Sequence, residues 1–184
     1  MTRTQPRVVA SGRLVQLRDK HIDDAPRDYA WRRDPELAAY DAARPLSMSY
    51  RSFVATFREE LEHPSPFRRT FGIEDPATGR HIGNVMYYGY ERDAGEAELG
   101  ITIGEREYWS RGFGTDTVVT MLRHLFEELG LRRVYLHTLT WNDRAQQAFH
   151  NAGLTDVKRV HRAGYDFILM DITRDDFVAR TIDA

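Results

Sequence analysis

A short glycine turn, Arg111-Gly112-Phe113-Gly114-Thr115, has the residue types and the position of an anion site. It follows an apolar, β-branched stretch, 97–103, and precedes a strong helical pattern over 118–129. The first N–H groups of a helix have no partner within the helix, and the helix dipole is positive at that end. Glycine also lets a phosphate approach the main chain. We therefore interpret the turn as a pyrophosphate site.

The spacing of this turn excludes two common nucleotide sites. A Rossmann turn would have a third glycine at position 117, where the chain has Thr117. A P-loop would contain Gly-Lys-Ser or Gly-Lys-Thr, which is also missing here. On the turn alone, an unrelated phosphate-binding module stays as a remote alternative.

A second sequence block, 142–154, lies one helix and one strand further along the chain. Together with 97–101 and 109–115 it resembles the acetyl-CoA motifs of the GNAT acetyltransferase superfamily. The chain is most similar to the branch of ribosomal-protein alanine N-acetyltransferases, which also includes polyamine and some antibiotic acetyltransferases. The resemblance is strong over residues 80–172 and diffuse over residues 10–79.

The resemblance implies that acetyl-CoA donates the acetyl group directly to a primary amine in a ternary complex. The backbone of Ile101, Thr102 and Ile103 would run along the pantetheine arm, with one N–H group polarising the thioester carbonyl. Arg111 would add a positive charge at the pyrophosphate, and Asn142 would bind the pantetheine while capping its own helix. A plain core strand and a plain helix cap would explain the same residues.

Glu98 is the candidate catalytic base. It lies fourteen positions before Gly112, the offset at which the histone-acetylating branch of the superfamily has its catalytic glutamate. An amine is mostly protonated at neutral pH, so a carboxylate must remove a proton, often through water, before or during attack. The alternative is a structural glutamate that hydrogen-bonds across the sheet and anchors the splayed strand.

Phe149 departs from the resembled pattern. Many GNAT enzymes have a tyrosine there as the general acid, and phenylalanine has no proton to donate. Another group or water must then protonate the thiolate, or no acid is needed because a thiol with a pKa of about 8.5 is a fair leaving group. Tyr108 and Tyr165 remain candidates without motif support. The departure keeps open a catalytically silent module that binds or senses acyl-CoA.

The amine acceptor is expected to bind in the first third of the chain, where the motifs are least specific. Trp31, Glu36, Tyr40 and Asp41 could form an aromatic, acidic pocket for a cationic amine, although such charged side chains usually face solvent. The sequence leaves the acceptor open between a protein N-terminus, a polyamine, an aminoglycoside and another amine. His137, on a predicted buried strand, is interpreted as a core histidine.

The pattern of elements predicts an α+β fold: one GNAT-like domain over 1–184, with a twisted, mostly antiparallel sheet. We expect six or seven strands, about four helices, and a splayed pair of central strands between which the cofactor enters. The expected elements, in chain order, are a lead-in over 1–11, a strand ending near Arg18-Asp19, a helix over 22–33, a loop or broken helix over 34–49, a helix over 50–61, strands over 70–74, 81–90 and 96–103, the helix after the glycine turn, a strand over 133–139, a helix over 142–152, strands over 156–161 and 165–171, and a frayed tail over 174–184.

Composition limits the remaining function classes. The 184 residues contain no cysteine, which excludes disulfides and a cysteine acyl-enzyme. The formal net charge of -2 gives no global field for nucleic acid or a membrane surface. Histidines lack metal-ligand spacing, and no apolar run has the roughly 18 residues of a membrane helix. We expect a cytoplasmic enzyme without a metal; the resemblance leaves a homodimer open.

Overall fold

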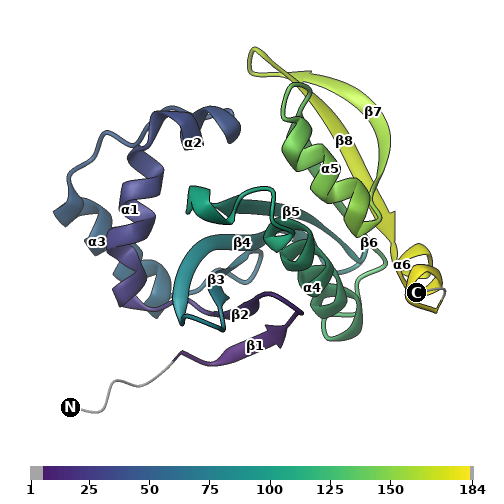
Figure 1. Ribbon diagram of the computed structural model, residues 1–184, viewed down its shortest axis with the longest axis horizontal. Coiled ribbons are helices and arrows are strands. Elements are labelled where there is room, and N and C mark those ends of the chain that lie inside the picture. The colour runs from purple at the N-terminus through teal and green to yellow at the C-terminus, as the bar shows by residue number, and fades with distance from the viewer. Residues whose placement is uncertain (1–5, 183–184) are drawn as a thin grey trace.

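The computed structural model describes residues 6–182 and is organised around one eight-stranded sheet (Figure 1). The strand order is β1-β2-β3-β4-β5-β6-β8-β7, and β5–β6 is the parallel pair in an otherwise antiparallel sheet. The strands are β1 (Val8–Ser11), β2 (Gln16–Asp19), β3 (Arg69–Asp75), β4 (Arg80–Glu91), β5 (Glu96–Ile103), β6 (Arg133–Leu139), β7 (Thr155–Arg162) and β8 (Tyr165–Thr173). The predicted α+β fold is confirmed.

Helices cover both faces of this sheet. Helices α1, α2 and α3 gather on one side of the molecule, whereas α4 and α5 lie beside each other over the centre (Figure 1). The α-helices are α1 (Ala25–Arg33), α2 (Pro35–Tyr40), α3 (Tyr50–Glu62), α4 (Phe113–Glu127), α5 (Asp143–Ala152) and α6 (Arg174–Ile182), with 3-10 turns at Ile22–Asp24 and Arg106–Tyr108.

The parallel strands β5 and β6 separate partway along their length. They pair only at Glu96–Arg133, Ala97–Val134 and Glu98–Tyr135. Beyond this point β5 remains paired with β4, and β6 with β8, over their whole lengths. The predicted splayed pair is present, and we call the diverging part, 99–103 opposite 136–139, the fork.

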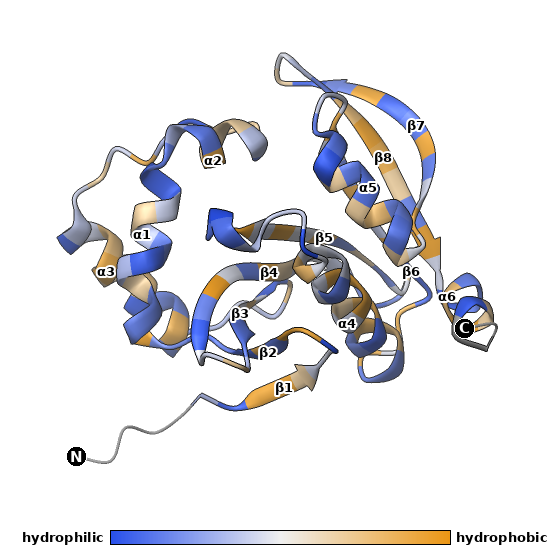
Figure 2. Ribbon diagram, viewed as in Figure 1, coloured by the Kyte–Doolittle hydropathy of each residue, from blue (hydrophilic) through white to orange (hydrophobic). Residues whose placement is uncertain are grey.

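Helix α4 anchors the fork from one face. Val118, Met121, Leu122 and Leu125 are fully buried in the main core, at the i, i+3, i+4, i+7 spacing that turns one side of a helix inward. The hydropathy colouring follows this division, with apolar segments of α4 and the central strands facing each other (Figure 2). Burial of this apolar stripe fixes the start of α4 beside the end of β5.

A buried network of charges lies beneath α1 on the other face. Arg18 bonds to Asp24 at 2.8 Å, and Lys20 bonds to Asp28 at 2.7 Å and to Asn84 at 2.6 Å. Each of these charges has a partner of opposite sign, which a buried ion requires. The network ties β2 and β4 to α1.

Three predicted elements differ from the structure. Residues 8–11, assigned to a lead-in, form β1, although residues 1–5 of that lead-in lie outside the described residues. The segment 34–49 contains a regular helix, α2, which Asp34 caps by accepting from Glu36 N and Leu37 N. The tail 174–182 is helix α6, whose Phe177 packs on Phe126. The strand and helix counts were therefore too low.

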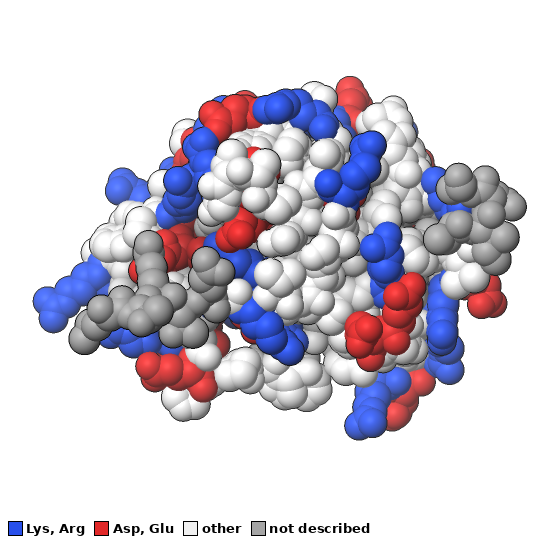
Figure 3. Space-filling model, turned by 60° about the horizontal axis from the view of Figure 1, so that its bottom comes forward, with Lys and Arg blue, Asp and Glu red and all other residues white. Residues whose placement is uncertain are grey.

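Positive and negative side chains are intermixed on the face shown in Figure 3, without a large area of one sign. This agrees with the near-neutral balance of 26 basic and 28 acidic residues. Among the described residues, no helix is long and apolar enough to cross a membrane.

Candidate active site

The fork contains the main cleft of the described structure, a cavity of about 740 Å³. Its walls come from β5, β6, the glycine turn, the start of α5, the end of α2 and the β7–β8 hairpin. Ten residues predicted to form the site line it: Tyr40, Asp41, Glu98, Ile101, Thr102, Ile103, Gly112, Gly114, Thr115 and Asn142. The fold therefore brings together residues that lie as far apart in the chain as Tyr40 and Asn142.

The glycine turn enters the cleft directly before α4. Gly112 has φ 85°, in the left-handed region that favours glycine, and α4 begins at Phe113. The Asp116 carboxylate accepts from the N–H groups of Leu14 and Val15 at 2.7 and 3.1 Å, so its charge is taken up on the β1–β2 side. The N–H groups of the first turn of α4 have no acceptor within the helix, so they remain available to bind an anion.

Two residues of the turn do not line the cleft. Arg111 donates to Glu107 O at 2.9 Å, and Phe113 is buried against Tyr108 with ring centres 4.8 Å apart. Gly112, Gly114 and Thr115 of the turn therefore line the cavity, rather than these two side chains.

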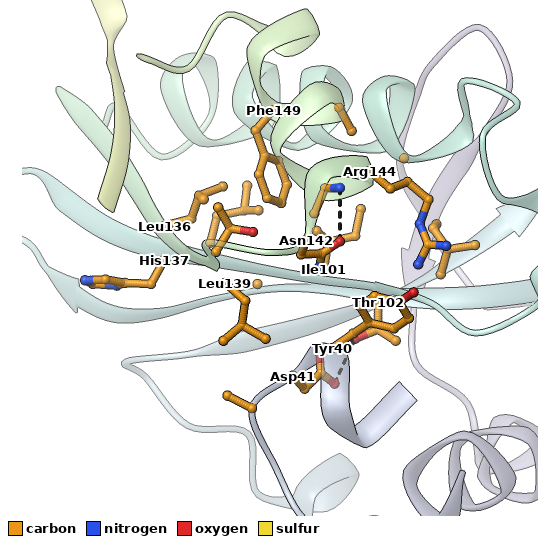
Figure 4. A pocket seen from close by; sticks show the side chains of 18 of the residues that line it. Tyr40, Asp41, Ile101, Thr102, Leu136, His137, Leu139, Asn142, Arg144 and Phe149 are labelled. Carbon is orange, nitrogen blue, oxygen red and sulfur yellow. Dashed lines mark hydrogen bonds between the residues drawn. The ribbon is translucent and has the colours of Figure 1, made fainter. Parts of the chain in front are cut away.

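The edge of β5 and the cap of α5 form the two sides of the fork. Within the fork, β5 faces no neighbouring strand on its β6 side, and Ile103 O accepts from Trp109 Nε1 at 2.7 Å. Asn142 is buried, and its Oδ1 accepts from Ala145 N at 3.3 Å, so it caps α5 as predicted (Figure 4). Both sides thus present polar main-chain or amide groups to the cleft.

An arginine and three aromatic rings gather at the open end of the fork. The Arg144 guanidinium carbon lies 3.6 Å from the Trp109 ring centre and 4.7 Å from that of Tyr40. Tyr40 also contacts Trp141, with ring centres 5.3 Å apart. The cluster joins α2 to α5 across the cleft. Sequence reasoning missed Arg144, although it lies inside the 142–154 block.

Glu98 lies at the closed end of the fork. Its Oε1 atom is 2.8 Å from His137 Nδ1, and Tyr88 is its cross-strand neighbour on β4. Burial, followed by the charge of Glu98, raises the pKa of Tyr88 well above its usual value. The sequence analysis interpreted His137 as a core residue, because the residues next to it in the chain do not indicate a partner on another strand.

Asp41 faces the other end of β5. The Thr102 hydroxyl donates to Asp41 Oδ2 at 3.3 Å (Figure 4). Burial of the carboxyl group in the cleft raises the pKa of Asp41 to about 6, against the smaller lowering effects of Thr102 and Arg32. The residue as a whole keeps solvent contact at the mouth of the cleft. Asp41 is therefore a carboxylate whose charge a bound cation would stabilise.

The other two residues of the predicted acceptor pocket lie elsewhere. Trp31 is buried against Gly104, where an added Cβ would come 2.2 Å from the indole ring, and its Nε1 donates to Glu105. Glu36 is exposed and pairs with Arg106 at 2.6 Å. The structure assigns the first to packing and the second to a surface ion pair.

No tyrosine takes the place of Phe149, which lines the cleft as a buried ring. Tyr108 also lines the cleft, but its hydroxyl donates to Asp75, which does not line it, at 3.0 Å. Tyr165 lines the cleft from the start of β8 and is exposed. Among the described residues, no group of three or more metal-ligating side chains is arranged to hold a metal ion.

A family model described as an acetyltransferase (GNAT) domain matches residues 13–155. The chain belongs to the GNAT acetyltransferase family. It is also 26% identical over 121 residues to the uncharacterized N-acetyltransferase p20 of Bacillus licheniformis, covering 65% of this chain and 67% of that protein. The predicted acetyl-CoA-dependent N-acetyltransferase is confirmed.

Solved structures agree with this GNAT fold. The spermidine N-acetyltransferase from Vibrio cholerae, in complex with CoA and spermine, is similar with a TM-score of 0.79 at 20% identity, over 90% of this chain and 98% of that one. The aminoglycoside acetyltransferase AAC(6')-Ib, in complex with coenzyme A, has a TM-score of 0.74 at 19% identity, over 91% and 99%. At these identities the likeness establishes the fold.

Proposed function

We propose that this GNAT enzyme acetylates a primary amine of a small cationic molecule, with acetyl-CoA and the amine approaching the fork from opposite faces. The supporting observation is the division of the cleft by the sheet. Asn142, Arg144 and Phe149 lie on one side of it, and Tyr40 and Asp41 on the other (Figure 4).

The cofactor face fits a long, flexible thioester with a charged end. Acetyl-CoA supplies an activated acetyl group when it is bound. The N–H groups at the start of α4 would hold the pyrophosphate, and the free edge of 101–103 would pair with the pantetheine arm. Asn142 would bind the same arm, and Arg144, rather than Arg111, would contribute the positive charge. Gly112 and Gly114 leave room for this approach because they have no side chain.

The acceptor face fits an amine with positive charge. Asp41 offers a carboxylate in a partly enclosed position, and the Tyr40 ring stands beside it. A cation gains from both a carboxylate and an aromatic face. The similar enzymes named for spermidine and for aminoglycosides act on small molecules with several amines, which supports the same acceptor class here.

Several finer assignments remain proposals. The branch of ribosomal-protein alanine N-acetyltransferases, with a protein N-terminus as acceptor, is the second candidate for substrate class on sequence resemblance alone. A homodimer, a cytoplasmic location and the roles of the individual site residues are likewise predictions from the sequence.

Position 149 has a phenylalanine where many family members have a tyrosine acid. This supports a second candidate function without catalysis, an acyl-CoA-binding module on the same fold. Thermal stabilisation by CoA is expected for both the enzyme and this module, whereas turnover is expected for the enzyme alone.

The deciding experiment measures release of free thiol from acetyl-CoA in the presence of spermidine, an aminoglycoside or a peptide with N-terminal alanine. We expect turnover with spermidine, with the aminoglycoside or with both, and a much smaller rate with the peptide. A rate confined to the peptide would replace the proposed acceptor by a protein N-terminus. Thermal stabilisation by CoA without any turnover would favour the binding module.

A further inference from the structure

Glu98 and His137 meet where the fork begins. Glu98 and Tyr135 form the last pair of the parallel ladder. Alternate residues of a strand point to the same face, so His137 points to the face of Tyr135 and Glu98. The 2.8 Å contact between His137 Nδ1 and Glu98 Oε1 thus joins two strands at the point where their backbones stop pairing.

The environment of Glu98 suits a residue that positions a neighbour. The residue is only 9% exposed, and its Oε1 atom is 2.8 Å from His137 Nδ1. A carboxylate that accepts from an imidazole N–H fixes the tautomer and the orientation of that ring. Glu98 therefore holds His137 in place through this contact.

The second ring nitrogen of His137 is available. A neutral imidazole that donates through Nδ1 to a carboxylate has its lone pair on Nε2. Nε2 has no hydrogen-bond partner among the described residues. The buried side-chain atoms without a partner in that part of the chain belong to Arg80, Thr117 and His124, so Nε2 of His137 is unpaired without being enclosed. His137 itself lines the cleft.

Two aromatic rings fix the plane of this imidazole. Tyr135 and Phe167 each stand edge-to-face with His137, with ring centres 6.2 Å away. With Nδ1 bonded to Glu98 and both sides of the ring packed, the direction of Nε2 is set before a substrate binds.

We propose that His137 is the proton acceptor of the acetyl transfer, through Nε2, and that Glu98 is its positioning residue. This inference rests on the proposed function, since it needs an amine in the acceptor face. It differs from the sequence prediction, which gave the base role to Glu98.

The step balances without a further reactant. The amine nitrogen forms a bond to the thioester carbonyl carbon, the carbon–sulfur bond breaks, and the sulfur leaves with its electron pair. The proton of the amine passes to His137 Nε2, and the resulting imidazolium then gives it to the thiolate sulfur. This last transfer is favourable because a thiol, with a pKa of about 8.5, holds a proton more tightly than an imidazole at about 6.5. One residue would therefore serve as base and then as acid, which accounts for a phenylalanine at position 149.

The charged and titratable groups around the ring come from each neighbouring element. Glu98 on β5 is the carboxylate in contact, and Tyr88 and Tyr135 contribute hydroxyl groups from β4 and β6. From the β7–β8 hairpin, Arg162 and Tyr165 also line the cleft. Of these, Glu98 is the partner that stabilises an imidazolium directly.

The test compares two replacements of His137. In His137→Asn, the side-chain amide can still donate to Glu98 from the position of Nδ1, but nothing replaces Nε2. In His137→Ala, both atoms are lost and a space remains. We expect kcat to fall about 100-fold or more in both variants, within the range for loss of a general base, while the KM for acetyl-CoA changes less than about twofold. Added imidazole should restore part of kcat to His137→Ala alone.

The control is His161→Ala, which removes a histidine–carboxylate contact of 2.7 Å with Asp166 on the exposed hairpin. Its kcat should match the native value. Glu98→Gln should change the pH profile of kcat, measured at saturating amine, while reducing kcat less than His137→Asn does.

The outcomes separate this inference from the proposed function. An active native enzyme whose His137→Asn variant retains native kcat would show that His137 only braces Glu98, and would overturn the inference alone. A larger loss in Glu98→Gln than in His137→Asn would return the base role to Glu98. Absence of turnover in the native enzyme with every amine, despite CoA binding, would overturn the proposed function and the inference together.

Discussion

The two faces of the cleft differ in whether main-chain groups or side chains are available to bind a ligand. On the cofactor face, the groups that can bind are mostly main-chain: the helix start after Gly112, the unpaired edge of 101–103, and the cap at Asn142. On the acceptor face they are side chains, such as Asp41, Glu98 and His137.

This difference determines what each face can recognise. Main-chain groups are the same in any sequence that folds this way, so they suit a cofactor that is common to a whole family. Side chains can be exchanged without changing the fold, so the acceptor face can be altered independently. Under the proposed assignment of the two faces, one face would therefore define the family and the other the substrate.

The largest expected effect tests whether the cofactor face depends on its main chain. Gly112→Asp places a side chain and a negative charge at a left-handed residue beside the anion site. We expect the acetyl-CoA affinity, measured by calorimetry, to fall about 100-fold or more. Gly130→Asp is the matched control, because Gly130 also has a positive φ of 69° but has no atom within 4 Å of an added Cβ. Equal losses in both variants would refute a local role for the turn.

A smaller effect is expected on the acceptor face. Asp41→Asn keeps the shape but removes the charge, so the KM for a cationic amine should rise about tenfold, equivalent to about 1.4 kcal/mol, with little change in the KM for acetyl-CoA. Glu36→Gln, which alters an exposed ion pair outside the cleft, should leave both constants unchanged.

The same carboxyl group gives a pH dependence. Because burial raises the pKa of Asp41 to about 6, its negative charge is present above that pH and is lost as the pH falls through it. The KM for the amine should therefore rise below about pH 6 in the native enzyme and stay flat in Asp41→Asn. A rise of the same size in the variant would exclude Asp41 as its origin.

The two arginines near the turn provide the one side-chain test on the cofactor face. Arg144→Gln should raise the KM for acetyl-CoA about fivefold, and the effect should shrink at high salt. Arg111→Gln should have a smaller effect, because Arg111 bonds to Glu107 O and does not line the cleft. The reverse order would restore the sequence prediction for Arg111.

The smallest expected effect is on stability rather than on binding, and it concerns a buried histidine of α4. His124 is buried in α4 without a hydrogen-bond partner among the described residues for either ring nitrogen, and burial lowers its pKa. The unfolded chain therefore binds the proton more tightly, so stability is full above about pH 6.5 and declines as the pH falls. His124→Leu should increase the free energy of unfolding by about 1 kcal/mol and weaken this decline, as followed by urea denaturation. Unchanged values of kcat and KM in His124→Leu would show that this core position affects stability without affecting either face of the cleft.

The elements on the side of the glycine turn could be predicted well because their signals are local. The bounds of β5 and β6, the cap at Asn142 and the left-handed Gly153 after α5 all follow from neighbouring residues. The short helix α2 was missed even though Asp34 followed by Pro35 is a start signal, because six residues give little periodicity.

The acceptor face was harder because its contacts join distant segments. Asp41 meets Thr102 across 61 positions, and His137 meets Glu98 across 39. Nothing in the pattern around a single histidine or aspartate indicates such a partner. Trp31 was placed in the pocket for its residue type, whereas its ring covers Gly104 in the packed interior.

The fork described here also makes acetyl-CoA a folding partner. In the free enzyme, 99–103 and 136–139 are strand edges in the middle of a sheet, and a bound pantetheine arm would complete the ladder between them. A ligand that binds only the folded state stabilises it in proportion to the logarithm of its concentration. The amide hydrogens of this central region should therefore exchange with solvent more slowly as the concentration of acetyl-CoA rises.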